Sequence, residues 1–189
     1  MSHRFATLAA LVALVGGGIG AIGGSASSAH ADAPIPTSTA RLTGTFLLAG
    51  TVTVAVNIYG EHRGEAVHRN WAFTPGCASG ACATVTLVRD RAKGSDRLVL
   101  KRAAPGYYVG YSTFYRPVRC GAGIYRPGER VPFRITVRIT QALISGGQAV
   151  ASRITASYRN QVRYNLTPCV AYLGHDAASY HGHVVLPVT

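Results

Sequence analysis

Hydrophobic and polar residues alternate with a period of two along most of the chain after residue 40. In the clearest example, Phe133, Ile135 and Val137 alternate with Arg134 and Thr136. Such alternation is typical of a β-strand that has one buried face and one solvated face. No long stretch beyond residue 40 shows the 3.6-residue period of an amphipathic helix. The pattern therefore predicts an all-β domain.

Segments rich in glycine, proline, serine and asparagine separate the alternating stretches and predict turns. Between them we expect about eight strands, with a further short strand near the C-terminus. The expected strands cover 42–58 (with a potential break at Gly50), 64–74, 82–90, 96–103, 107–117, 131–143, 148–159 and 162–168, and the final one covers 183–187. Consecutive strands with short connections indicate an antiparallel β-sandwich or an up-and-down β-barrel.

The first 31 residues have the pattern of a helical secretory signal peptide. A short basic segment that ends at Arg4 precedes an apolar run, and Ala29-His30-Ala31 forms a small-residue cleavage site. The alternative is a retained membrane anchor, but several glycines between residues 16 and 24 weaken the apolar run as a helix. We expect cleavage after Ala31, a secreted protein, an extended linker over 32–40 and a single all-β domain over 41–189.

Four cysteines in an exported chain predict two disulfides, which can form in three pairings. Cys77 and Cys82 flank a short turn-like segment, and this spacing favours a local bridge. Cys120 and Cys169 then pair by elimination. A zinc site is the alternative, but the cysteines lack the C-x₂-C spacing of zinc knuckles.

Charge indicates the kind of partner. The chain carries 19 lysines and arginines against 7 aspartates and glutamates, a formal net charge of +12. Such an excess favours contact with an anionic cell-wall polymer or with lipid headgroups, although composition bias and solubility are a sufficient alternative reason. We expect no nucleic acid as a partner and no cofactor.

Two segments resemble small, uncharacterised secreted β-domain proteins of actinobacteria. One is the junction at residues 29–34, and the other runs from Trp71 to Leu87 through the first two cysteines. The resemblance implies export and a β fold and carries no activity. The strand count is also loosely like that of lipocalins, but their G-x-W motif is absent from the first strand.

Candidate binding residues lie on two of the expected strands. Arg69 has the parity of its apolar neighbours and of Trp71, so it points inward, where it either reads an anionic group in a barrel mouth or marks a strand end. Tyr107, Tyr111 and Tyr115 share one face of the most aromatic strand. They either stack on sugars or bases or pack within the sheet.

Metal binding and catalysis have weaker signals. His175, His181 and His183 crowd the C-terminal segment, where Asp176 could join them around a metal ion, but solvated histidines are the simpler interpretation. No carboxylate pair, G-x-S-x-G motif or free cysteine is placed for catalysis. We therefore expect that the protein is not an enzyme.

The main functional hypothesis from the sequence is a binding or cell-envelope interaction protein with an arginine-rich surface. The alternatives are a lipocalin-like carrier of a small apolar ligand and an enzyme with no recognisable site.

Overall fold

The computed structural model describes residues 34–91, 94–170 and 173–185, and the predicted signal peptide lies outside this part. The described part is all-β, as expected. Its strands are β1 (Gly44–Val56), β2 (Ala66–Pro75), β3 (Thr84–Asp90), β4 (Ser95–Ala104), β5 (Tyr107–Cys120), β6 (Gly123–Ser145), β7 (Gln148–Arg159), β8 (Tyr164–Asn165) and β9 (His175–Val184). None of the described residues belongs to a helix that is long and apolar enough to cross a membrane.

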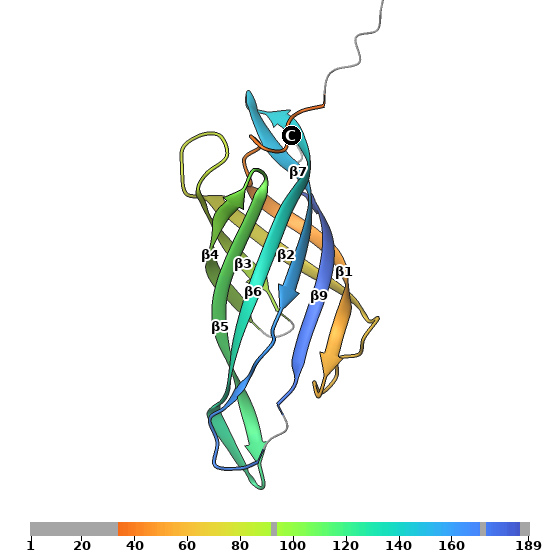
Figure 1. Ribbon diagram of the computed structural model, residues 1–189, viewed down its shortest axis with the longest axis vertical. Coiled ribbons are helices and arrows are strands. Elements are labelled where there is room, and N and C mark those ends of the chain that lie inside the picture. Colours follow the sequence, from red (N-terminus) through yellow and green to blue (C-terminus); the bar gives the residue numbers. More distant parts are fainter. Residues whose placement is uncertain (1–33, 92–93, 171–172, 186–189) are drawn as a thin grey trace, which may run out of the picture. The chain divides into compact units, whose positions relative to one another are not determined.

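The strands form one antiparallel sheet that closes on itself in a ring (Figure 1). Strands β1 to β6 each pair with the next strand along the chain, and β9 pairs with both β7 and β1. The two-residue β8 pairs only with β6. This closed meander has the connectivity of an up-and-down barrel, and closure leaves few unpaired strand edges.

Two expected strands near the C-terminus are wrong in extent. The strand expected over 162–168 is reduced to β8, whereas the short strand expected over 183–187 is the ten-residue β9 that closes the ring. The inward positions of β9 are Asp176, Ala178, Tyr180 and Gly182, so one large side chain stands among small or charged ones. Because these residues give no apolar alternation, the sequence pattern conceals the strand.

The expected break at Gly50 is also absent, because β1 continues through it to Val56. A Cβ atom at Gly50 would collide with the backbone carbonyl of Ser179 and with the ring of Tyr180 on the neighbouring β9. Glycine is thus needed here for the close approach of β9 rather than for a turn.

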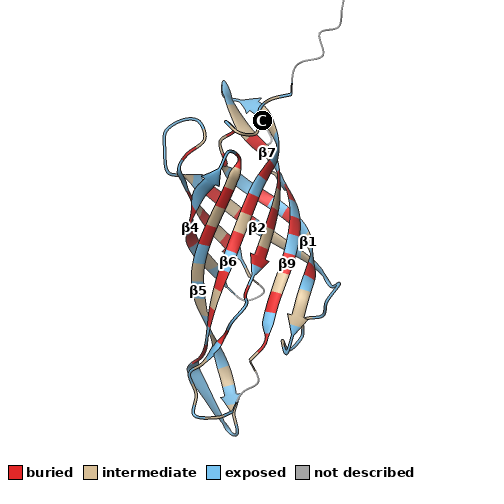
Figure 2. Ribbon diagram, viewed as in Figure 1, coloured by how far each residue is buried: buried red, intermediate tan, exposed pale blue. Residues whose placement is uncertain are grey.

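Burial alternates along each strand, so that one set of side chains fills the ring and the other faces solvent (Figure 2). Toward the end that holds the C-terminal end of β9, the interior is packed with apolar side chains. This closed half contains Phe46, Leu48, Trp71, Phe73, Val85, Leu87, Leu98, Leu100, Tyr108, Ile135, Val137 and Ile154, each at most 5% exposed. The ring of Trp71 packs against that of Tyr180, with centroids 5.4 Å apart.

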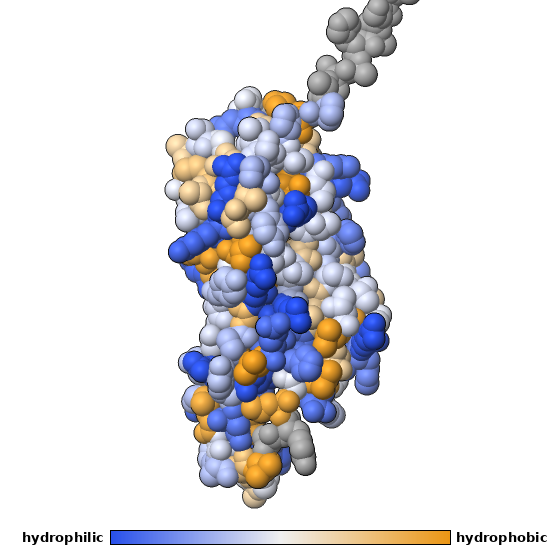
Figure 3. Space-filling view, viewed as in Figure 1, coloured by the Kyte–Doolittle hydropathy of each residue, from blue (hydrophilic) through white to orange (hydrophobic). Residues whose placement is uncertain are grey.

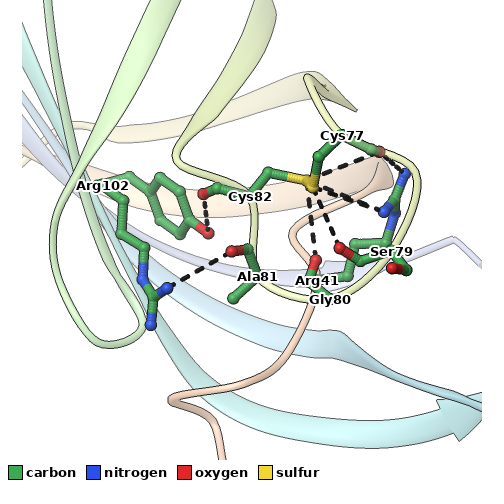
Figure 4. Close-up of a disulfide and its surroundings, with 8 residues drawn as sticks. Arg41, Cys77, Ser79, Gly80, Ala81, Cys82 and Arg102 are labelled. Carbon is green, nitrogen blue, oxygen red and sulfur yellow. Dashed lines mark hydrogen bonds between the residues drawn. A yellow bond between two sulfur atoms is a disulfide. The ribbon is translucent and has the colours of Figure 1, made fainter.

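The segment before β1 covers the closed end of the ring. The backbone of Arg41 exchanges hydrogen bonds with Ala149 and Ala151 of β7, and Ala40 and Leu42 are buried. The Arg41 guanidinium also donates to the carbonyl of Cys77 at 2.6 Å. Figure 4 shows Arg41 beside the small loop that the Cys77–Cys82 disulfide closes.

Both expected disulfides are confirmed. Cys77 is bonded to Cys82 at the closed end, where the Tyr108 hydroxyl donates to the Cys82 carbonyl at 3.2 Å. Cys120 is bonded to Cys169 and joins the end of β5 to the segment between β8 and β9. The first bridge therefore closes the loop between β2 and β3, and the second fastens an irregular segment to the sheet.

Candidate functional site

The opposite half of the ring holds a polar pocket of about 770 Å³. It is bounded by the ends of β1, β3, β5 and β7, by the starts of β2 and β9, and by the loop between β1 and β2. This volume lies within the range of 300–1,000 Å³ that is typical of small-molecule sites. The charged residues of its wall are Glu61, Glu65, Arg69, Arg89, Arg91, Arg116, Arg163 and Asp176.

Arg89 is one of two buried arginines of the wall and is 5% exposed. Its guanidinium donates to Asp96 of β4 at 2.7 Å and stacks over the rings of Phe133 and Tyr158, at 4.1 and 4.7 Å from their centroids. Arg91 contacts the same carboxylate at 3.0 Å. Burial lowers the pKa of Arg89, and the charge of Asp96 opposes this shift, so the carboxylate keeps the arginine charged in the interior.

Arg163 forms a second buried cluster. It contacts Glu129 of β6 at 3.2 Å and Asp176 of β9 at 2.5 Å, and its Nε donates to the side chain of Asn160 at 3.1 Å. Burial lowers the pKa of Arg163, but the hydrogen bond and charge of Asp176 and the charge of Glu129 outweigh it and raise the pKa overall. The Tyr158 hydroxyl donates to Asp176 at 3.4 Å. This network joins β6, β7 and β9 beneath the pocket.

The mouth of the pocket carries charges of both signs. Glu61 and Glu65 come from the loop between β1 and β2, Arg69 from β2 and Arg116 from β5. Burial and the nearby Asp176 raise the pKa of Glu61, although Arg116 opposes this rise. Residues 116–118 of β5 lie near the loop between β1 and β2. Both segments line a second, smaller pocket, to which the loop contributes residues 57–59.

The outer face of β5 and β6 holds an ordered row of tyrosines and arginines. In the register of the two strands, Tyr107, Tyr111 and Tyr115 lie opposite Arg138, Arg134 and Arg130, respectively, and we call these six residues the Tyr–Arg ladder. The guanidiniums of Arg138 and Arg134 lie 4.9 and 5.9 Å from the ring centroids of their partners. That of Arg130 lies 4.2 Å from the ring of Tyr164. These contacts are of cation–π type and hold the arginines along the strand surface.

Acidic side chains are withdrawn from this outer face. Among the described residues, every aspartate and glutamate except Asp90 either lines the pocket or pairs with an arginine that lines it. The outward positions of β4, β5, β6, β7 and β9 carry arginine, lysine and histidine but no carboxylate. In Figure 3, strongly hydrophilic side chains are interspersed with hydrophobic ones along one face of the molecule. The excess of positive charge therefore lies on the outside of the ring.

The structure divides the candidate binding residues among three places. Arg69 lines the pocket, and Tyr115, the last tyrosine of the Tyr–Arg ladder, also borders it. Trp71 is 1% exposed within the apolar core. Tyr107 and Tyr111 face outward from β5, and Tyr111 is 70% exposed. The five residues therefore do not form one site.

The candidate metal residues do not come together. His175, His181 and His183 are exposed along the outer face of β9, whereas Asp176 points into the ring and binds Arg163. Within the described ranges, no group of three or more histidine, cysteine, aspartate or glutamate side chains is placed to hold a metal ion.

Several pocket residues were missed by the sequence reasoning, although a signal for them exists. Arg89 has the parity of Val85 and Leu87, and Asp96 has the parity of Leu98 and Leu100. A charged residue at the same alternate positions as the apolar residues of a strand points into the ring with them. From the sequence, only Arg69 was assigned to the interior in this way. Two such residues of opposite charge on adjacent strands predict a buried ion pair.

The chain matches no known family model and no curated protein sequence. Its function is therefore argued from the chemistry of the outer face and of the pocket.

Proposed function

We propose that the protein is an exported, non-enzymatic binding protein whose arginine-rich outer face holds an anionic polymer of the cell envelope. The observation that carries this proposal is the separation of charge described above, which leaves the outward positions of β4 to β7 and of β9 without a carboxylate. A surface of one sign attracts a polymer of the opposite sign over several ångströms. The two disulfides, which are typical of extracellular proteins, support export.

The Tyr–Arg ladder favours a saccharide polymer over lipid headgroups. Its members lie along two paired strands, so they meet an extended chain along its length. Exposed tyrosine rings, such as that of Tyr111, offer an apolar face and a polar hydroxyl to a sugar ring. Arginine adds paired donors for carboxylate or phosphate groups. A flat layer of headgroups would use the charges but not this linear order.

Binding to immobilised polygalacturonate, with neutral dextran as the comparison, tests the proposal. We expect retention on polygalacturonate alone and elution as the salt concentration rises, because exposed charges are screened over about 10 Å at 0.1 M salt. The ladder variant Arg130→Gln/Arg134→Gln/Arg138→Gln should elute at lower salt than the parent protein. Retention of the parent on both polymers, or on neither, contradicts the proposal.

A matched variant separates the ladder from net charge. Arg63→Gln/Arg97→Gln/Arg126→Gln removes the same charge from three other exposed arginines. We expect this variant to elute between the ladder variant and the parent. Tyr111→Ala should weaken binding to polygalacturonate but leave binding to phosphatidylglycerol vesicles unchanged. Equal elution of the two triple variants would show that the ladder has no special part.

A further inference from the structure

The mouth of the pocket contains unpaired charges of both signs. Arg89, Arg91 and Arg163 each have a carboxylate within 4 Å, but Arg69 and Arg116 have none in the described part of the chain. Likewise, the carboxylates of Glu61 and Glu65 have no basic side chain of the described part within that distance. The pocket therefore offers two cations and two anions that the fold itself leaves without an ion pair.

The deeper wall of the pocket is largely aromatic. Phe114 and Tyr158 lie beside the stacked guanidiniums of Arg91 and Arg89, and the Tyr180 ring completes this side. The Nε atom of Arg89 is buried and has no hydrogen-bond partner among the described residues. A group that enters the pocket thus finds aromatic side chains in the wall and, at the mouth, charges of both signs.

We propose that this pocket binds a small zwitterion of short-peptide size. Its carboxylate lies at Arg69 and Arg116, and its ammonium group lies at Glu61 and Glu65. The apolar part of the ligand packs on the aromatic wall. The volume of about 770 Å³ accommodates a ligand larger than a single amino acid. This inference is independent of the polymer-binding function proposed for the outer face.

The charge pattern of the mouth favours a zwitterion over the simpler ligand classes. A purely apolar ligand would exclude water from four charged side chains and give them no partner in return. A simple anion would satisfy the arginines but would approach two carboxylates, and a simple cation would meet the converse problem. A ligand that carries both charges pairs with both sets, and its contacts are charge-assisted hydrogen bonds.

Calorimetric titration of the disulfide-bonded protein with three matched peptides tests the proposal. The probes are the dipeptide phenylalanyl-phenylalanine, its N-acetyl form, which lacks the ammonium group, and its C-terminal amide, which lacks the carboxylate. We expect the free dipeptide to bind about tenfold more tightly than either capped form, because each cap removes one charge-assisted contact. Failure of all three to bind, or equal binding by the dipeptide and a capped form, would overturn the proposal.

Variants assign the two ends of the ligand. In Arg116→Gln, the advantage of the dipeptide over its amide should shrink, because only Arg69 then remains for the carboxylate, while the difference from the N-acetyl form is kept. In Glu61→Gln, the advantage of the dipeptide over its N-acetyl form should shrink instead, because only Glu65 then remains for the ammonium group. Arg119→Gln, an exposed residue of the same strand outside the pocket, serves as the control and should leave all three affinities unchanged. The opposite pattern in either pocket variant would contradict the assignment. Polygalacturonate binding should be retained in Glu61→Gln, so failure here is distinguishable from failure of the outer face.

Discussion

The two halves of the ring are built from the same strands and have opposite interiors. In the closed half, the inward positions of β3 and β4 are Val85, Leu87, Leu98 and Leu100, which pack without polar groups. Toward the mouth, the next inward positions on the same two strands include Arg89 and Asp96, which form an ion pair. Hydrophobic burial stabilises the first half, whereas paired charges fill the second half and leave room for a pocket.

The difference between the two halves shows where a closed sheet can accommodate a binding pocket. A packed apolar half fixes the ring, so the other half does not have to contribute a dense core. Its inward side chains can then be long and charged, as Arg163 and Glu129 are, and can leave space between them. Variants that affect one half alone can test this division.

The largest effect is expected in the closed half, from Trp71→Ala. Trp71 is 1% exposed and contacts the rings of Phe73 and Tyr180. Its removal should lower the free energy of unfolding by about 3–5 kcal/mol, as measured by urea denaturation. Trp71→Phe should cost less, because the indole Nε1 has no hydrogen-bond partner among the described residues and the aromatic volume is largely kept. A cost below about 1 kcal/mol for Trp71→Ala would contradict the assignment of a packed half.

Removal of each disulfide in turn tests the contribution of one end of the ring to stability. The Cys120–Cys169 bridge at the open end spans 49 residues, and the Cys77–Cys82 bridge at the closed end spans 5. In the chain-entropy model, replacing the first pair by alanine costs about 4 kcal/mol and replacing the second about 2 kcal/mol. Urea unfolding of the two double variants measures the difference. Equal costs would show that local packing around the bridges, and not loop closure, determines their contribution.

In the open half, Asp96→Asn should destabilise the fold by about 3 kcal/mol. The substitution leaves the buried guanidinium of Arg89 without its counter-charge and also weakens the contact with Arg91. Adding Arg89→Met in the same chain should restore most of the loss, because removing both members of a buried pair costs far less than removing one. If the double variant is no more stable than Asp96→Asn, Asp96 does not act mainly through Arg89.

The sequence carries the information for the fold more openly than for the pocket. The apolar parity of Leu98 and Leu100 predicts a strand, and the cysteine spacing predicts both disulfides, since each depends on local pattern. By contrast, the inward residues of β9 are Asp176, Ala178, Tyr180 and Gly182, and this mixture of charged, small and aromatic residues does not form an apolar run. Its role depends on its two neighbours in the ring, which are far away in the sequence.

The buried cluster around Arg163 could not be predicted from local sequence for the same physical reason. Arg163 lies in an irregular segment after β7 and not in the strand expected over 162–168, so strand parity does not place its side chain. Its contacts with Glu129 and Asp176 join residues 34 and 13 positions away. Only closure of the ring brings these groups together, whereas Arg69 could be assigned to the interior because it lies within a regular strand.

The smallest effect is a pH-dependent one at the mouth, from Glu61→Gln. Burial and the neighbouring Asp176 and Glu65 raise the pKa of Glu61 above its ordinary value of 4.5, although Arg116 and Arg163 oppose this rise. The folded state then binds the proton more tightly than the unfolded state. The parent therefore loses stability as the pH rises from about 4.5 through the raised pKa. Glutamine does not ionise, so Glu61→Gln should have the higher Tm at pH 7, by less than about 3 °C, because Glu61 is only partly buried.

Melting curves of the two proteins between pH 4 and pH 8 measure this difference. It should shrink as the pH falls toward the ordinary carboxyl pKa, because Glu61 is then protonated in both the folded and the unfolded state. Glu61→Asp keeps an ionisable group in the loop and should retain the loss of stability with rising pH. A Glu61→Gln difference that is constant across the range would mean that the substitution acts through packing. The loop between β1 and β2 would then contribute contacts to the open half rather than an unpaired charge, and the ammonium end of the proposed ligand would lose one of its two partners.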